Sequence, residues 1–155
     1  MSWLALLAFN GLLGCAAAVD LRTYRIPNVL PLLVAASAFV LHLPADAQAW
    51  IDRGAAAALV GLGCGALWLR GLFGGGDFKL IWACALWTGL SGLTPFVMAF
   101  GLACGAQGLF VLLAARTAEG RATPLRTRLG GRVPLALSIA AAGLYWSLLQ
   151  APKLH

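Results

Sequence analysis

The sequence predicts an all-α polytopic membrane protein: a single domain, residues 1–155, with about six transmembrane helices. Hydrophobic residues make up 61% of the chain and charged residues only 10%, whereas soluble domains carry about 25% charged residues. The mean hydropathy is +0.88. A water-soluble fold of this size would have too few polar side chains to cover its surface, so a lipid bilayer is the natural solvent for the chain.

Six apolar segments separated by more polar connections suggest the number of helices. A membrane-spanning helix needs about 17–25 residues. The second and fourth segments are shorter than this, which leaves open whether they cross the bilayer completely. The segments are Trp3–Val19, Val29–Leu43, Arg53–Phe73, Phe78–Leu93, Pro95–Ala115 and Val133–Leu149.

The distribution of basic residues predicts the orientation. If all six segments cross, the connections 20–28, 70–79 and 116–132 lie on one side and contain all Lys and Arg residues except Arg53 and Lys153. Positive charge gathers in cytoplasmic loops. We therefore expect a multi-pass protein of the inner (cytoplasmic) membrane, with these connections in the cytoplasm and both termini facing outward.

Several function classes lack support. The net charge of +6 is spread between apolar segments and not over a polar face, so nucleic acid is not an expected partner. No metal-, thiol- or nucleotide-binding motif is present, and no cofactor or metal is expected. The four cysteines stand alone within apolar segments, as packing residues do; they are Cys15, Cys64, Cys84 and Cys104.

Two of the five acidic residues stand out as candidate functional groups. Asp20 ends the first segment, where a negative charge opposes the helix dipole, so helix capping does not explain it. Asp77 comes just before the fourth segment. Structural alternatives exist for each: Asp20 could pair with Arg22 or Arg25, and Asp77 could be a helix N-cap. The predicted topology puts both aspartates at the same cytoplasmic boundary.

Two converging carboxyl groups can hydrolyse a peptide bond. They cannot both ionise easily and tend to share one proton. One can then act as a base on water while the other polarises the scissile carbonyl. Two other function classes stay open: a small ion- or proton-coupled transporter or channel subunit that uses both aspartates, and a non-catalytic membrane assembly factor.

Three consecutive glycines, Gly74, Gly75 and Gly76, precede Asp77. Glycine permits tight turns and lets another backbone approach closely. The run could therefore shape a site for an extended substrate strand, although a plain turn between helices is the structural alternative.

Three stretches of the chain resemble the type IV prepilin peptidases, which belong to the GxGD aspartyl intramembrane peptidases. Residues 19–28, VDLRTYRIPN, resemble the first aspartate motif of that family. Residues 74–79, GGGDFK, resemble its GxGD motif, including a lysine two residues after the aspartate. Residues 133–140, VPLALSIA, resemble the start of its last helix.

The resemblance implies roles for individual residues. It makes Asp20 and Asp77 the catalytic pair, with Gly74 and Gly76 shaping the site. Four further residues match motif positions without a defined role: Arg22, Pro27, Asn28 and Lys79. By position, Pro134 lines the cleft or is simply the first residue of a helix.

The resemblance also implies a substrate class. The family removes the short basic leader from prepilins at the cytoplasmic membrane face, so we expect a membrane aspartyl endopeptidase whose partners are a prepilin or pseudopilin and membrane lipid. Larger members carry a methyltransferase region after the first span. Only about nine residues join the first two segments here, which resembles the compact peptidase-only form of tight-adherence (Flp) pilus systems and predicts no methylation.

Overall fold

The computed structural model describes residues 2–117 and 135–151, and all the regular structure in this part of the chain is helical. The all-α prediction is therefore confirmed. The helices are α1 (Trp3–Thr23), α2 (Val29–Leu41), α3 (Ala47–Leu69), α4 (Gly75–Thr117) and α6 (Leu135–Gln150).

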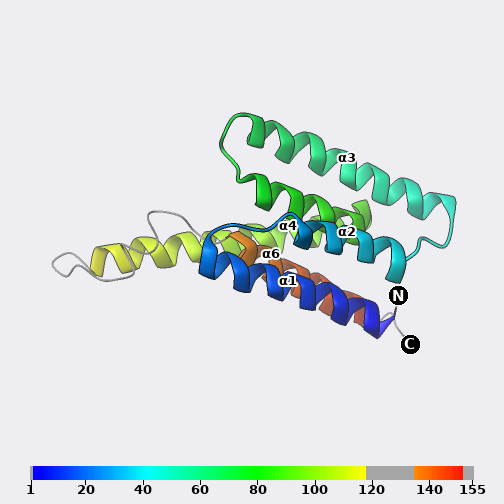
Figure 1. Cartoon of the computed structure of the whole chain (residues 1–155), viewed down its shortest axis with the longest axis horizontal. Helices are drawn as coiled ribbons and strands as arrows, with labels where there is room; N and C mark the ends of the chain where they lie inside the picture. Colours follow the sequence, from blue (N-terminus) through cyan, green and yellow to red (C-terminus); the bar gives the residue numbers. More distant parts are fainter. Residues whose placement is uncertain (1, 118–134, 152–155) are drawn as a thin grey trace.

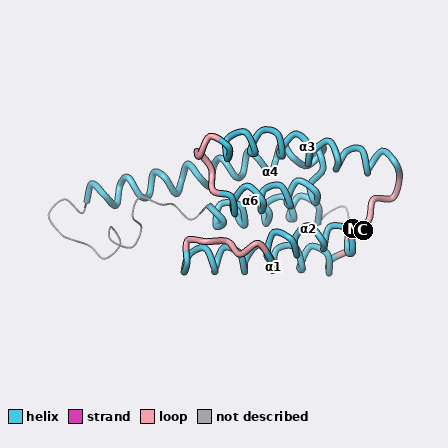
Figure 2. The backbone as a smooth tube through the Cα atoms, turned by 45° about the horizontal axis from the view of Figure 1, so that its top comes forward, coloured by secondary structure: helices cyan, strands magenta, loops and turns pink. Residues whose placement is uncertain are grey.

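The helices run roughly antiparallel in one bundle (Figure 1 and Figure 2). α3 packs mainly against α4, which also contacts α6, and α6 packs against α1. At one end of the bundle α1 and α3 finish while α4 and α6 begin (Figure 1). We call this the aspartate end, because it contains Asp20 and Asp77. The opposite end contains the start of α1 and α3 and the end of α2 and α6.

α4 consists of two helical parts that meet at Gly89. The second part turns back from the break and extends beyond the bundle at the aspartate end (Figure 1). The apolar segments of the sequence had suggested a boundary between Leu93 and Pro95. That boundary was wrong: Pro95 lies inside the second part, and the backbone breaks at Gly89, with φ 62° and ψ 178°.

Aspartates begin two helical parts at the opposite end. Asp52 directly precedes the apolar segment Arg53–Phe73 in the sequence, but the N-cap of α3 is Asp46, which accepts a hydrogen bond from the Ala49 amide at 2.7 Å. Asp52 lies one turn inside α3, and its carboxylate accepts a hydrogen bond from the Ser91 amide at 3.2 Å. Asp52 thus caps the second part of α4 from a neighbouring helix.

Gly89→Ala is expected to destabilise the protein by about 1–3 kcal/mol, since the Gly89 conformation is essentially restricted to glycine. A Cβ atom at this position would also collide with the Asp52 carboxylate. The free energy of unfolding in mixed micelles measures the loss. Gly105→Ala, within the second part of α4 and facing open space, should cost nothing; equal losses in the two variants would contradict this account.

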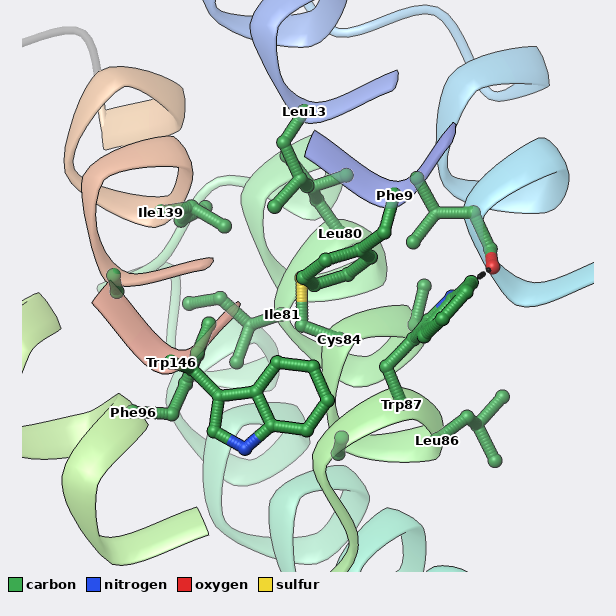
Figure 3. Packing of buried hydrophobic residues seen from close by; sticks show 14 of the residues in the cluster. Phe9, Leu13, Leu80, Ile81, Cys84, Leu86, Trp87, Phe96, Ile139 and Trp146 are labelled. Carbon is green, nitrogen blue, oxygen red and sulfur yellow. Dashed lines mark hydrogen bonds between the residues drawn. The ribbon is translucent and has the colours of Figure 1, made fainter. Parts of the chain in front are cut away.

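Aromatic side chains join four helices in the core (Figure 3). The ring of Phe9 from α1 lies 4.8 Å from that of Trp87 in α4 and 5.8 Å from that of Trp146 in α6, centroid to centroid. The indole N–H of Trp87 donates to the Val34 carbonyl oxygen of α2 at 2.8 Å. These contacts fix α1, α2, α4 and α6 relative to one another, and thereby fix where α1 ends and α4 begins.

Large apolar side chains cover much of the described surface, and the core contains many alanines beside its large buried side chains. In α3, Ala56 and Ala57 are buried, whereas Leu59, Leu62 and Leu69 are exposed. Two described helices, Trp3–Thr23 and Gly75–Leu113, are long and apolar enough to cross a membrane by length and composition, although the second contains the Gly89 break. The number of membrane crossings and their orientation stay predictions.

Candidate active site

Asp20 lies in the last turn of α1 but interacts with a different helix. α1 ends at Thr23, and the next residue, Tyr24, is its C-cap: its backbone is left-handed (φ 51°), and its amide donates to the Asp20 carbonyl oxygen at 2.8 Å. The Asp20 side chain is only 6% exposed, and its Oδ2 accepts a hydrogen bond from the Ala136 amide at 3.2 Å. Ala136 is in the first turn of α6, so the dipole of α6 favours the charge that the dipole of α1 opposes.

The hydrogen bond from Ala136 bears on the structural alternative for Asp20, which was an ion pair with Arg22 or Arg25. Arg22 and Arg25 are both exposed, and the Asp20 carboxylate faces the N-terminus of α6 instead. The sequence reasoning missed Ala136. The available signal was Asp20 itself, because an acidic residue at a helix C-terminus requires favourable electrostatics from elsewhere.

Asp77 lies in the first turn of α4 and is partly buried. It is not the N-cap: the Phe78 amide donates to the Gly74 carbonyl oxygen at 2.9 Å, so the helix begins after Gly74. Asp20 lies close enough for its charge to act on the Asp77 carboxyl group. The two predicted catalytic residues, far apart in the sequence, therefore lie near enough at the aspartate end to interact electrostatically.

The three glycines before Asp77 each leave room for a different neighbour. A Cβ atom on Gly74 would lie 2.5 Å from Oδ2 of Asp77, and one on Gly76 would lie 3.0 Å from Cβ of Ile26. A Cβ atom on Gly75 would lie 3.1 Å from the indole nitrogen of Trp68. The glycines thus let the Asp77 carboxyl fold back over the loop, and let the segment after α1 and the end of α3 approach α4.

The other predicted site residues divide into three groups. Asn28 and Lys79 meet directly: the Lys79 ammonium donates to Oδ1 of Asn28 at 2.9 Å. Arg22 and Pro27 are exposed at the same end. Pro134 lies outside the described residues.

The Asn28–Lys79 hydrogen bond should couple the two aspartate-bearing segments. In a double-mutant cycle of Asn28→Ala and Lys79→Met, we expect a coupling energy of about 0.5–1.5 kcal/mol in the free energy of unfolding, as for one hydrogen bond to a charged group near the surface. Pairing Asn28→Ala with Arg70→Met, at an exposed basic residue of the same end that makes no hydrogen bond to Asn28, supplies the control cycle. Additive effects of Asn28→Ala and Lys79→Met would show that the contact contributes nothing.

Sequence comparison supplies an independent identification. A family model described as the type IV leader peptidase family matches residues 7–117, a stretch that contains both aspartates, the three glycines and Lys79. No match was found among curated proteins or among solved structures. The match covers most of the chain and confirms the resemblance that the two aspartate motifs had indicated. The chain belongs to the type IV leader peptidase family.

Proposed function

We propose that this protein is a membrane aspartyl endopeptidase that removes the basic leader peptide from prepilin-like proteins at the cytoplasmic face of the membrane, with Asp20 and Asp77 as its catalytic pair. One observation carries the proposal. Two acidic groups that are far apart in the family-matched region lie within electrostatic reach of each other at the start of α4, in a chain of a peptidase family.

The environments of the two carboxyl groups support different protonation states. Asp20 accepts a hydrogen bond from a backbone amide at the N-terminus of α6, which stabilises a carboxylate. A second negative charge beside it is unfavourable. We therefore assign the base to Asp20 and the acid to a protonated Asp77.

The proposed reaction needs only these two groups and water. Asp20 removes a proton from a water molecule while the water oxygen forms a bond to the scissile carbonyl carbon. At the same time Asp77 donates its proton to the carbonyl oxygen. The tetrahedral intermediate then returns a proton to Asp77, the carbon–nitrogen bond breaks, and Asp20 delivers its proton to the leaving amine. Both carboxyl groups end as they began, and one water has been added across the peptide bond.

The surface of the protein supports a membrane location. Exposed leucines on α3 and α4, among them Leu62, Leu102 and Leu109, surround a core rich in alanine. Exposed apolar area on this scale is costly in water and normal in lipid, where small residues allow helices to pack closely. A substrate helix could therefore reach the aspartate end from within the bilayer, with its leader unwound near the glycines so that the scissile carbonyl is free.

Ion transport is less well supported. Transporters bind their ions near mid-depth, on interrupted helices, whereas both candidate carboxyl groups lie at one end of the bundle. The interruption of α4 at Gly89 is at the other end and has no carboxyl group from this pair beside it.

The test is cleavage of a purified prepilin by the purified chain in detergent micelles, where no ion gradient exists. We expect two products, and the mass of each should place the cut between the basic leader and the apolar segment that follows. A preparation of the double variant Asp20→Asn/Asp77→Asn controls for contaminating proteases. Failure of the wild-type chain to cleave any prepilin with a basic leader would refute the proposal.

A further inference from the structure

A pocket at the opposite end of the bundle belongs to no part of the proposed catalytic site. Its volume is about 310 Å³. It lies where α2 and α6 end, α3 begins and α4 breaks at Gly89, and is lined by ten residues: His42, Ala49, Asp52, Arg53, Trp87, Thr88, Gly89, Ser91, Trp146 and Gln150.

Unpaired buried polar atoms gather in this pocket. Four buried polar side-chain atoms in the described part of the chain lack a hydrogen-bond partner, and three belong to lining residues: Nδ1 of His42, Oγ1 of Thr88 and Nε1 of Trp146. Thr88 is 5% exposed and Trp146 is 2% exposed. The Trp146 nitrogen points away from the apolar side chains of the core (Figure 3). Such groups are costly to bury unless something binds them.

The charges of the pocket indicate the kind of molecule that fits. Arg53 is 7% exposed and donates to the backbone carbonyl oxygens of Ala38 and His42, neither of which neutralises its charge. Asp52 supplies one negative charge. The ionised lining groups therefore sum to zero while presenting both signs, which favours a zwitterion over a net anion.

The surroundings of the pocket indicate a lipid over a soluble molecule. Leu90, Leu149 and Ile51 are each adjacent in sequence to a lining residue, and all three are exposed. Trp50 beside the pocket is exposed and stacks on Phe39, with ring centroids 6.0 Å apart. Apolar side chains beside a polar pocket match acyl chains beside a headgroup, and exposed tryptophans are typical of headgroup depth.

We infer that this pocket binds the headgroup of a zwitterionic phospholipid that carries a primary ammonium group and a phosphate. The indole N–H of Trp146 and the hydroxyl of Thr88 would donate to phosphate oxygens beside the positive charge of Arg53, and the Asp52 carboxylate would accept from the ammonium group. The site is independent of peptide hydrolysis, so its success or failure does not depend on the proposed catalytic pair.

Native mass spectrometry of the delipidated full chain tests the inference. Phosphatidylethanolamine and phosphatidylglycerol with identical acyl chains are added in equal amounts. We expect one phosphatidylethanolamine to bind at least about tenfold more tightly than phosphatidylglycerol. Trp146→Phe keeps an aromatic side chain but removes the indole N–H donor, so it should weaken this binding roughly tenfold, the effect of one buried hydrogen bond. Trp3→Phe, at an exposed tryptophan of the same end, should leave it unchanged.

A change of selectivity separates recognition from misfolding. Asp52→Asn keeps an oxygen for the Ser91 amide but removes the negative charge, so phosphatidylglycerol should now bind as well as or better than phosphatidylethanolamine. Soluble glycerophosphoethanolamine forms the remaining arm and should bind far more weakly than the lipid. Equal binding of both lipids by the wild type, no retained lipid, unchanged selectivity in Asp52→Asn, or binding of the soluble compound as tight as that of the lipid would each overturn the inference.

Discussion

Leader cleavage is expected to fall on the order of 10³-fold or more when either Asp20 or Asp77 is replaced by Asn. A positioned acid or base contributes about 10²–10⁴-fold to a rate, and the two groups act on the same water and carbonyl. Asn preserves the size of the side chain, and in Asp20→Asn the amide oxygen can still accept the hydrogen bond from the Ala136 amide. The rate constant for cleavage of a saturating prepilin substrate is the measurement.

Asp46→Asn is the matched control for these variants. Asp46 makes the same kind of bond, from the Ala49 amide to a carboxylate oxygen, but at the opposite end of the bundle. Asparagine is as good an N-cap as aspartate, so cleavage should be unchanged. If Asp20→Asn or Asp77→Asn retains more than a tenth of the wild-type rate, that residue is not part of the chemistry.

Gly74→Ala is expected to lower kcat about 100-fold while KM changes little. The added Cβ atom would lie 2.5 Å from Oδ2 of Asp77, so the carboxyl group has to move. A displacement of about 1 Å in a catalytic geometry costs on the order of 10²-fold. Gly74 itself is exposed and precedes the helix, so the free energy of unfolding should change by less than about 1 kcal/mol.

Two further variants separate this effect from a general intolerance of alanine. Gly63→Ala in α3 adds a Cβ atom into open space and should cleave like the wild type. Gly76→Ala presses on Ile26 and not on the carboxyl group, so it should disturb the segment between α1 and α2 and raise KM as well. A Gly74→Ala protein with normal kcat would show that the Asp77 carboxyl works in another position.

The sequence predicted the helical class and the placement of both aspartates at one end because both depend on patterns that the chain displays directly. Long apolar segments forbid any lipid-exposed structure other than helices and closed barrels. The alternating direction of the helices places Asp20 and Asp77 at one end whatever the details of packing.

The remaining details depend on contacts between segments distant in the sequence, which no local pattern encodes. Asp52 precedes an apolar run just as an N-cap does, yet the helix begins earlier and Asp52 caps α4. The sequence placed the helix boundary just before Pro95, but the backbone of α4 turns at Gly89. Nothing in the sequence around Gly75 indicated that the Trp68 side chain would lie close to it.

The bond between Asp20 and the first turn of α6 has a consequence for biosynthesis. The Asp20 carboxylate accepts its hydrogen bond from a helix that is synthesised after α1 to α4, and the family-matched region ends before that helix begins. A nascent chain that has inserted only α1 to α4 would contain both aspartates but lack the amide that bonds Asp20. On the proposed mechanism, proteolytic competence therefore arises only after α6 has been made.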